Sequence, residues 1–144
     1  MDVNNRFHTE KTFLWVRLEH IALLIVAGFM VVLHLDEVSW PGFILAFVAI
    51  DLIGYLPGAI AHRRSKNGKV SPLFHHLYNF THSYLVAGVV VALWALATGG
   101  FEWAMLAIPL HLSGDRGLFG NTYKPQTLPF EPAPPESFAL FEEM

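Results

Sequence analysis

The sequence contains no cysteine and few charged residues. The absence of cysteine excludes disulfides, thiol chemistry and thiolate-ligated iron–sulfur clusters. Charged residues make up 15% of the 144 residues, whereas a soluble domain has about 25%. Hydrophobic residues make up 53%, so the composition predicts a single domain that lies in a membrane. The net charge of -3 is small and predicts no nucleic-acid partner.

The first residues lack the basic start, short apolar run and small-residue cleavage site of a signal peptide. We therefore expect the first apolar segment to be retained as a membrane span. Long apolar segments cover residues 14–35, 40–61 and 73–98, and a shorter one, 101–112, can cross a membrane only by continuing through 113–119. The sequence thus predicts an all-α fold, a four-helix transmembrane bundle over residues 14–122 between an N-terminal flank (1–13) and a tail (123–144).

Lysine and arginine are absent from two of the connections between these segments, 36–39 and 99–100. All nine lie near the start of the chain, in the basic loop 62–72, or on the C-terminal side. With four spans these three stretches share one side of the membrane, and the positive-inside rule makes that side cytoplasmic. We therefore predict a multi-pass protein of the bacterial inner membrane, surrounded by the lipid bilayer, with both termini in the cytoplasm.

The tail from residue 123 contains five of the nine prolines and several glutamates. Such a composition cannot form a core by itself. An ordered tail would need a surface to lie on, which indicates either another membrane-protein subunit or the protein's own cytoplasmic face.

Ionisable side chains within the apolar segments are costly, by about 2.5–3.5 kcal/mol for an Asp at mid-helix. Counted from the cytoplasmic end of each segment, such residues lie at similar depths in all four, which predicts one shared site. The candidate metal ligands are His20, Asp51, His82, His111 and Asp115. Pro57 and Pro109 are expected to break helices beside Asp51 and His111, as is typical of binding sites in membrane bundles.

The stretch 73–84 carries three of the eight histidines. At about 100° per residue, His75, Asn79 and His82 share one helix face. Lipid offers polar groups no partner, so this face must look into the protein interior or a wet cavity. Gly54 and Gly58, four residues apart, would let another helix approach closely.

Neutral imidazoles with one or two carboxylates are typical ligands of zinc and non-haem iron. A divalent metal could lower the pKa of a bound water and supply a hydroxide at the level of the lipid headgroups. The first hypothesis is therefore a metal-dependent hydrolase of an amphipathic substrate, with Asp51, His82 and His111 as catalytic residues. Residues that would position the substrate are Tyr55, Tyr78, Asn79 and Arg116. The basic loop would attract an anionic headgroup.

Two other hypotheses explain the same residues, and no compact motif such as His-Glu-x-x-His decides between them. The protein could be an accessory subunit of a larger membrane complex, in which Asp51 pairs with a cation to hold helices together and the tail docks on a partner. It could also bind haem, because His20 and His34 lie fourteen residues apart on nearly one helix face. A haem needs a second histidine at the same depth on another helix. At the depth of His20, His82 or His111 could serve, but no histidine matches His34.

Several motifs follow one another in a fixed order along the chain. They are Arg17-Leu18-Glu19, Asp51-x-x-Gly54-Tyr55-x-x-Gly58, Tyr78-Asn79-x-x-His82 and His111-x-x-x-Asp115-Arg116, followed by Gly120 and Lys124. Over residues 15–124 the chain resembles a bacterial integral-membrane family without an assigned activity, domain-of-unknown-function family 4260. It differs from the usual family pattern in having Ile50 in place of proline and in the basic stretch 63–69, which looks like an insertion.

This resemblance implies a helical membrane fold and a set of site residues, but no reaction. Thr81-His82-Ser83, after an upstream Asp, is also similar to membrane-bound metal-dependent hydrolases. That second likeness implies a metal.

Overall fold

The computed structural model describes residues 10–132, and every regular element in this range is helical. The elements are α1 (Glu10–Leu33), α2 (Trp40–Gly54), α3 (Leu56–Arg64), α4 (Pro72–Thr81), α5 (Tyr84–Thr98), the 3-10 helix η1 (Trp103–Leu106), α6 (Ala107–Gly114) and the π-helical turn η2 (Asp115–Phe119). The predicted all-α class is therefore confirmed for this range. Residues 1–9 and 133–144, which include most of the predicted flank and half of the tail, lie outside it.

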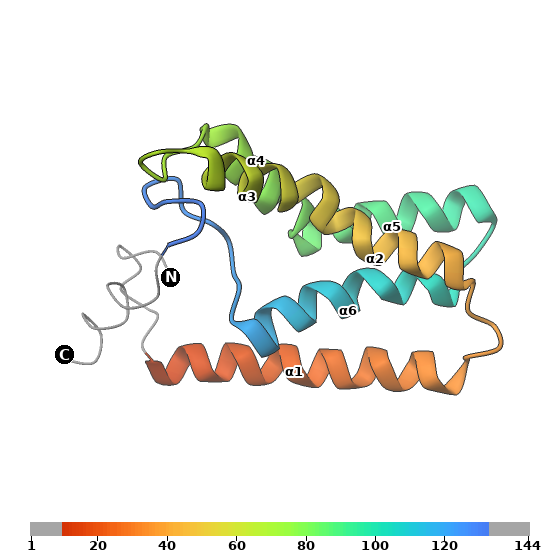
Figure 1. The fold of residues 1–144 in the computed structure, drawn as a ribbon. Coiled ribbons are helices and arrows are strands. Elements are labelled where there is room, and N and C mark those ends of the chain that lie inside the picture. The colour runs from red at the N-terminus through yellow and green to blue at the C-terminus, as the bar shows by residue number, and fades with distance from the viewer. Residues whose placement is uncertain (1–9, 133–144) are drawn as a thin grey trace.

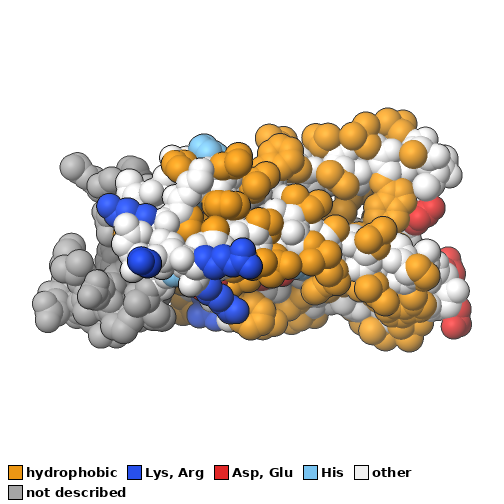
Figure 2. All heavy atoms as spheres, turned by 45° about the horizontal axis from the view of Figure 1, so that its top comes forward, with side chains coloured by type: hydrophobic (Ala, Val, Ile, Leu, Met, Phe, Trp, Pro, Cys, Tyr) orange, Lys and Arg blue, Asp and Glu red, His pale blue; other side chains and the backbone are white. Residues whose placement is uncertain are grey.

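Successive segments run back and forth along one direction (Figure 1). α1 runs one way, α2 and α3 return, α4 and α5 run out again, and α6 and η2 return beside α1. The loop after α3 and the described tail lie at one end of the molecule, and the connections after α1 and α5 lie at the other. On the face in Figure 2, the Lys and Arg side chains lie in the left half, and most of the visible Asp and Glu side chains lie at the right end. Which end faces the cytoplasm stays a prediction from these charges.

Two helical stretches, Lys11–Leu33 and Trp40–Arg64, are long and apolar enough to cross a membrane, which is consistent with a membrane protein. α4 and α5 meet the same criteria only as a pair bent by 56°. Many large apolar side chains on the outer surfaces of these helices are exposed, including Leu45 on α2 and Leu85 and Leu96 on α5. The predicted fourth span consists of three short helices, η1, α6 and η2, so the four-span topology stays a prediction.

The predicted apolar segment 73–98 is not one straight helix, because it breaks at His82 and Ser83. Neither proline nor glycine is present there, but the Thr81 hydroxyl and His82 Nδ1 both contact the Tyr78 carbonyl and compete with the backbone bonds of the helix. The Tyr78 carbonyl accepts from the backbone N–H of His82 (2.9 Å) and from the Thr81 hydroxyl (3.1 Å). Arg116 Nη2 donates to the His82 carbonyl (2.9 Å). The break places His82 at the corner between α4 and α5.

Both predicted proline breaks occur at helix starts. Pro57 lies in the first turn of α3, immediately after α2 has ended at Gly54. Pro109 lies in the first turn of α6, where the 3-10 helix η1 gives way to an α-helix. At such positions the missing N–H of proline has no helical partner to lose. Asp51 therefore lies about one turn before the junction of α2 and α3. His111 lies about one turn after the junction of η1 and α6.

Candidate metal centre

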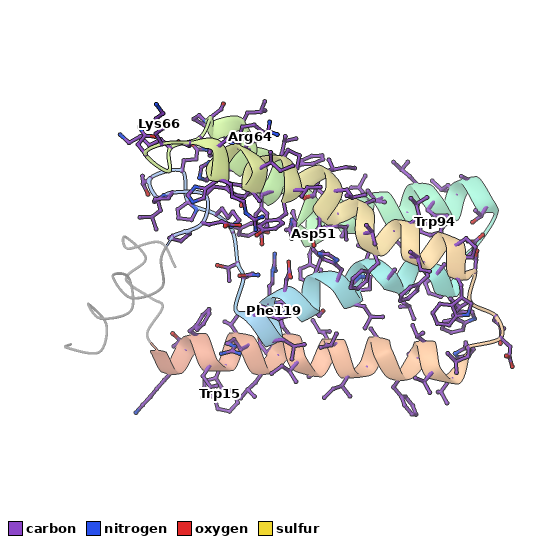
Figure 3. The ribbon with its side chains drawn as sticks, in the orientation of Figure 1. Trp15, Asp51, Arg64, Lys66, Trp94 and Phe119 are labelled. Atoms are coloured by element: carbon purple, nitrogen blue, oxygen red, sulfur yellow. The ribbon has the colours of Figure 1, made fainter. Side chains whose placement is uncertain are left out.

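Four ionisable side chains from separate elements converge inside the molecule. They are Asp51 of α2, His82 at the C-terminal cap of α4, His111 of α6 and Asp115 at the start of η2. One ligand atom of each lies within 4.8 Å of the corresponding atoms of the others. In Figure 3, Asp51 points from α2 into the space toward α6. We call these four residues the His/Asp group.

The two histidines face both carboxylates. His82 Nε2 lies 3.3 Å from Asp51 Oδ1 and 3.3 Å from Asp115 Oδ2. His111 Nε2 lies 3.6 Å and 3.8 Å from the same two oxygens. Both imidazoles are buried, whereas the Asp51 side chain is 46% exposed. The group is therefore buried on its histidine side and open on the Asp51 side.

The hydrogen bonds of His82 define its tautomer. Its Nδ1 lies 2.9 Å from the Tyr78 carbonyl, which can only accept, so Nδ1 carries a hydrogen. In a neutral imidazole, Nε2 then presents a lone pair toward two carboxylate oxygens. His111 has no hydrogen-bond partner for either ring nitrogen among the described residues. Buried acceptors that face one another in this way need either a proton on the imidazoles or a metal cation between them.

Two imidazole nitrogens and two carboxylate oxygens form a donor set that suits zinc or non-haem iron. The His/Asp group could therefore hold a metal ion. Of the five predicted ligands, the structure brings together Asp51, His82, His111 and Asp115.

The fifth predicted ligand, His20, lies outside the group. Its ring stacks on Tyr84 at 5.7 Å, and its Nδ1 is 3.5 Å from the Tyr84 hydroxyl, which in turn contacts Ser113 Oγ at 2.7 Å. His34, the other histidine of the haem hypothesis, stacks on Trp103 at 3.5 Å, and its Nδ1 lies 2.8 Å from the Met30 carbonyl. His20 of α1 and His34, which directly follows α1, are thus engaged away from the His/Asp group.

Neighbouring side chains hold the ligands in place. The Tyr78 ring stacks on His82 at 3.9 Å with 15° between the planes, and Phe47 contacts His111 edge-on at 4.7 Å. Gly54 makes room for the α4 corner, because a Cβ there would lie 1.9 Å from Thr81 Oγ1. Such support fixes the orientation of a ligating imidazole.

The four predicted substrate-binding residues have two different surroundings. Tyr55 and Tyr78 line a cavity of about 500 Å³ beside the His/Asp group, together with Asp51, Asp115, Lys124 and Glu131. We call it the polar cavity. Asn79 and Arg116 bind backbone atoms instead: Asn79 exchanges two hydrogen bonds with Lys124 (3.0 and 2.7 Å), and Arg116 holds the His82 carbonyl. In this structure their polar groups position the chain around the site.

The described part of the tail lies on the predicted polar face of α4. His75 Nε2 is 3.3 Å from the Leu128 carbonyl, and Asn79 binds the backbone of Lys124. Phe130 is 0% exposed and packs against Ala59 and Tyr78. The face of His75, Asn79 and His82 therefore looks into the protein interior as predicted, and residues 121–132 form its cover.

Two tail residues at the polar cavity, Lys124 and Glu131, were not among the predicted site residues. Lys124 Nζ donates to the Phe130 carbonyl (2.7 Å) and lies over the rings of Tyr78 and Phe130. Burial lowers the pKa of Lys124, with Glu131 and Asp115 acting in the opposite direction. The Glu131 carboxylate accepts a hydrogen bond from the Tyr55 hydroxyl. The order of motifs included Lys124, but nothing in the sequence pointed to Glu131.

Comparisons of the chain with protein-family models, curated proteins and solved structures found no match.

Proposed function

We propose that this protein is a metal-dependent membrane hydrolase whose metal is held by Asp51, His82, His111 and Asp115. The observation that carries the proposal is His82, whose Nδ1 hydrogen is held by the Tyr78 carbonyl while Nε2 faces two carboxylates at 3.3 Å. A metal would supply the partner that these buried nitrogens lack when the imidazoles are neutral. His111 has no hydrogen-bond partner within residues 10–132.

When bound, a divalent metal supplies a Lewis acid and lowers the pKa of a coordinated water. The residues of this chain account for the rest of the chemistry. Asp51 is half exposed and lines the polar cavity, so substrate and water reach the group from that side. Glu131 lines the same cavity, where its carboxylate accepts the proton that the attacking water gives up. Tyr55 holds Glu131 in this position.

The surroundings favour an amphipathic substrate. The helices beside the group are apolar enough to cross a membrane, and the positive-inside rule puts the basic loop after α3 in the cytoplasm. The group then lies in the inner half of the bilayer of a bacterial inner membrane. Arg63, Arg64, Lys66 and Lys69 attract anionic headgroups to this side. The resemblance to domain-of-unknown-function family 4260 agrees with this proposal but adds no reaction to it.

The experiment is hydrolysis of short-chain and long-chain fluorogenic acyl esters by the purified protein, stripped of metal and reloaded with Zn²⁺, Fe²⁺ or Mn²⁺. We expect turnover only after reloading. Glu131→Gln should lower kcat by about 10²–10⁴-fold, because it removes the proton acceptor, while the metal content stays unchanged. Glu19→Gln, an exposed glutamate of α1, is the matched control. Equal turnover with and without chelator would contradict the proposal.

An accessory subunit is the second candidate, and the exposed apolar surfaces of α1 and α5 favour it. In that case the His/Asp group is held together by protons on the imidazoles, and the distances of 3.3–3.8 Å are those of ion pairs that join α2, α4 and α6. Metal would then change neither activity nor stability.

A further inference from the structure

A second cavity, of about 560 Å³, lies between α2, α4 and α5 on the other side of the His/Asp group. Its lining is apolar apart from the Thr81 hydroxyl and includes Ala46 and Ala49 of α2 and Val90 of α5. It spans the 56° bend between α4 and α5, with Thr81 before the bend and Val86 after it among its lining residues. We call it the apolar groove.

One end of the apolar groove lies beside the His/Asp group, whose own members do not line it. Ile50 lines it and directly precedes Asp51. Thr81 also lines it, and its hydroxyl is 3.0 Å from His82 Nδ1. From Ile53 the groove extends along α2 to Gly42, a helical distance of about 16 Å. Trp94 lies at that far end, within 3.6 Å of where a Gly42 Cβ would be.

The His/Asp group thus lies between two cavities of opposite character. The apolar groove lies within the span Trp40–Arg64, at the depth of lipid chains. The polar cavity carries Lys124 and Glu131 and opens toward the tail. A molecule that fills both must have an apolar body and a polar head, with the bond between them at Asp51.

We propose, on the basis of the function above, that the substrate is a single-chain acyl ester whose acyl chain lies in the apolar groove and whose alcohol lies in the polar cavity. The oxygen of a water adds to the ester carbonyl carbon at the His/Asp group. The carbon–oxygen bond to the alcohol breaks, and the alcohol oxygen takes up the proton that Glu131 received. The free acid is left in the groove and the alcohol in the polar cavity.

The lining favours a hydrocarbon chain over a helix from a second copy of the protein. A single hydrocarbon chain is narrow enough to follow the small residues Gly42, Ala46 and Ala49 along α2. The groove also ends beside the His/Asp group, which a contact between two copies does not require.

The test uses a palmitic acid with a photoreactive diazirine in mid-chain, added to the full-length protein in phosphatidylcholine–phosphatidylglycerol vesicles, with and without metal. Labelled residues are located by mass spectrometry. We expect labelling to concentrate on groove residues of α2 and α5 in both metal states. Ala49→Trp and, independently, Val90→Trp should reduce it at least tenfold by filling the groove. Ala92→Trp, on the exposed side of α5, should leave it unchanged.

Metal content of the variants separates this inference from the proposed function. Groove labelling in a protein that neither binds metal nor hydrolyses esters would refute the hydrolase and keep the acyl-chain site. Labelling spread evenly over exposed apolar residues, and insensitive to Ala49→Trp and Val90→Trp, would overturn the acyl-chain site. Chemical crosslinking between α2 of one copy and α5 of another, abolished by the same variants, would overturn it in favour of a dimer contact.

Discussion

Removal of metal by a chelator is expected to lower the free energy of unfolding by about 2.7 kcal/mol, if the free metal concentration beforehand is about 100 times its Kd. The reason is that His82 Nε2 and the carboxylates of Asp51 and Asp115 present only acceptors to one another when His82 is neutral. A metal held by the native state alone shifts the equilibrium toward that state. The measurement is denaturant unfolding in a mild detergent, followed by circular dichroism, with and without chelator.

Two substitutions should abolish this difference. His82→Ala removes a ligand whose Nε2 lies 3.3 Å from both carboxylates, and Asp115→Asn keeps the shape of the side chain but removes its charge. Asp36→Asn, at an exposed position after α1, is the matched control and should keep the full effect of the chelator. If wild type and His82→Ala respond identically to the chelator, protons rather than a metal join the four residues.

Phe130→Ala is expected to destabilise the packing of the tail by about 3–5 kcal/mol. Phe130 is fully buried, and it packs on Tyr78 and against the bare backbone of Gly58. This loss should release residues 121–132 from α3 and α4. Hydrogen exchange followed by mass spectrometry should show faster exchange across these residues, with the metal content unchanged because Phe130 contacts no ligand.

Gly58→Ala should have the same effect from the other side of the contact, because a Cβ at this position would lie 2.3 Å from the Phe130 ring. Phe119→Ala is the control, since the Phe119 side chain is 73% exposed. Unchanged exchange in residues 121–132 of both Phe130→Ala and Gly58→Ala would show that other contacts hold the tail.

The sequence predicted the helical class and the start of the second helix at Trp40, because runs of apolar residues and the N-terminal position of Pro41 are local signals. It also predicted four of the residues that converge in the His/Asp group. That prediction succeeded because an ionisable side chain in an apolar segment is costly, so similar depths in several segments indicate a shared site.

The errors come from interactions between distant residues. Counting depth along the segments could not give the rotation of α1, which turns His20 toward Tyr84. The bend at His82 depends on Arg116, which follows 34 residues later. Gly58 does allow a close approach, but Phe130 of the tail makes it rather than another helix. The contact of Glu131 with Tyr55 joins residues 76 positions apart, which no local pattern reveals.

The most direct test of the metal site is elemental analysis of the purified protein by plasma mass spectrometry, beside a His82→Ala, Asp51→Ala double variant. The proposed site predicts one zinc, iron or manganese ion per chain in the wild type and none in the double variant. A wild-type protein free of metal, or one whose metal content the two substitutions leave unchanged, would contradict it.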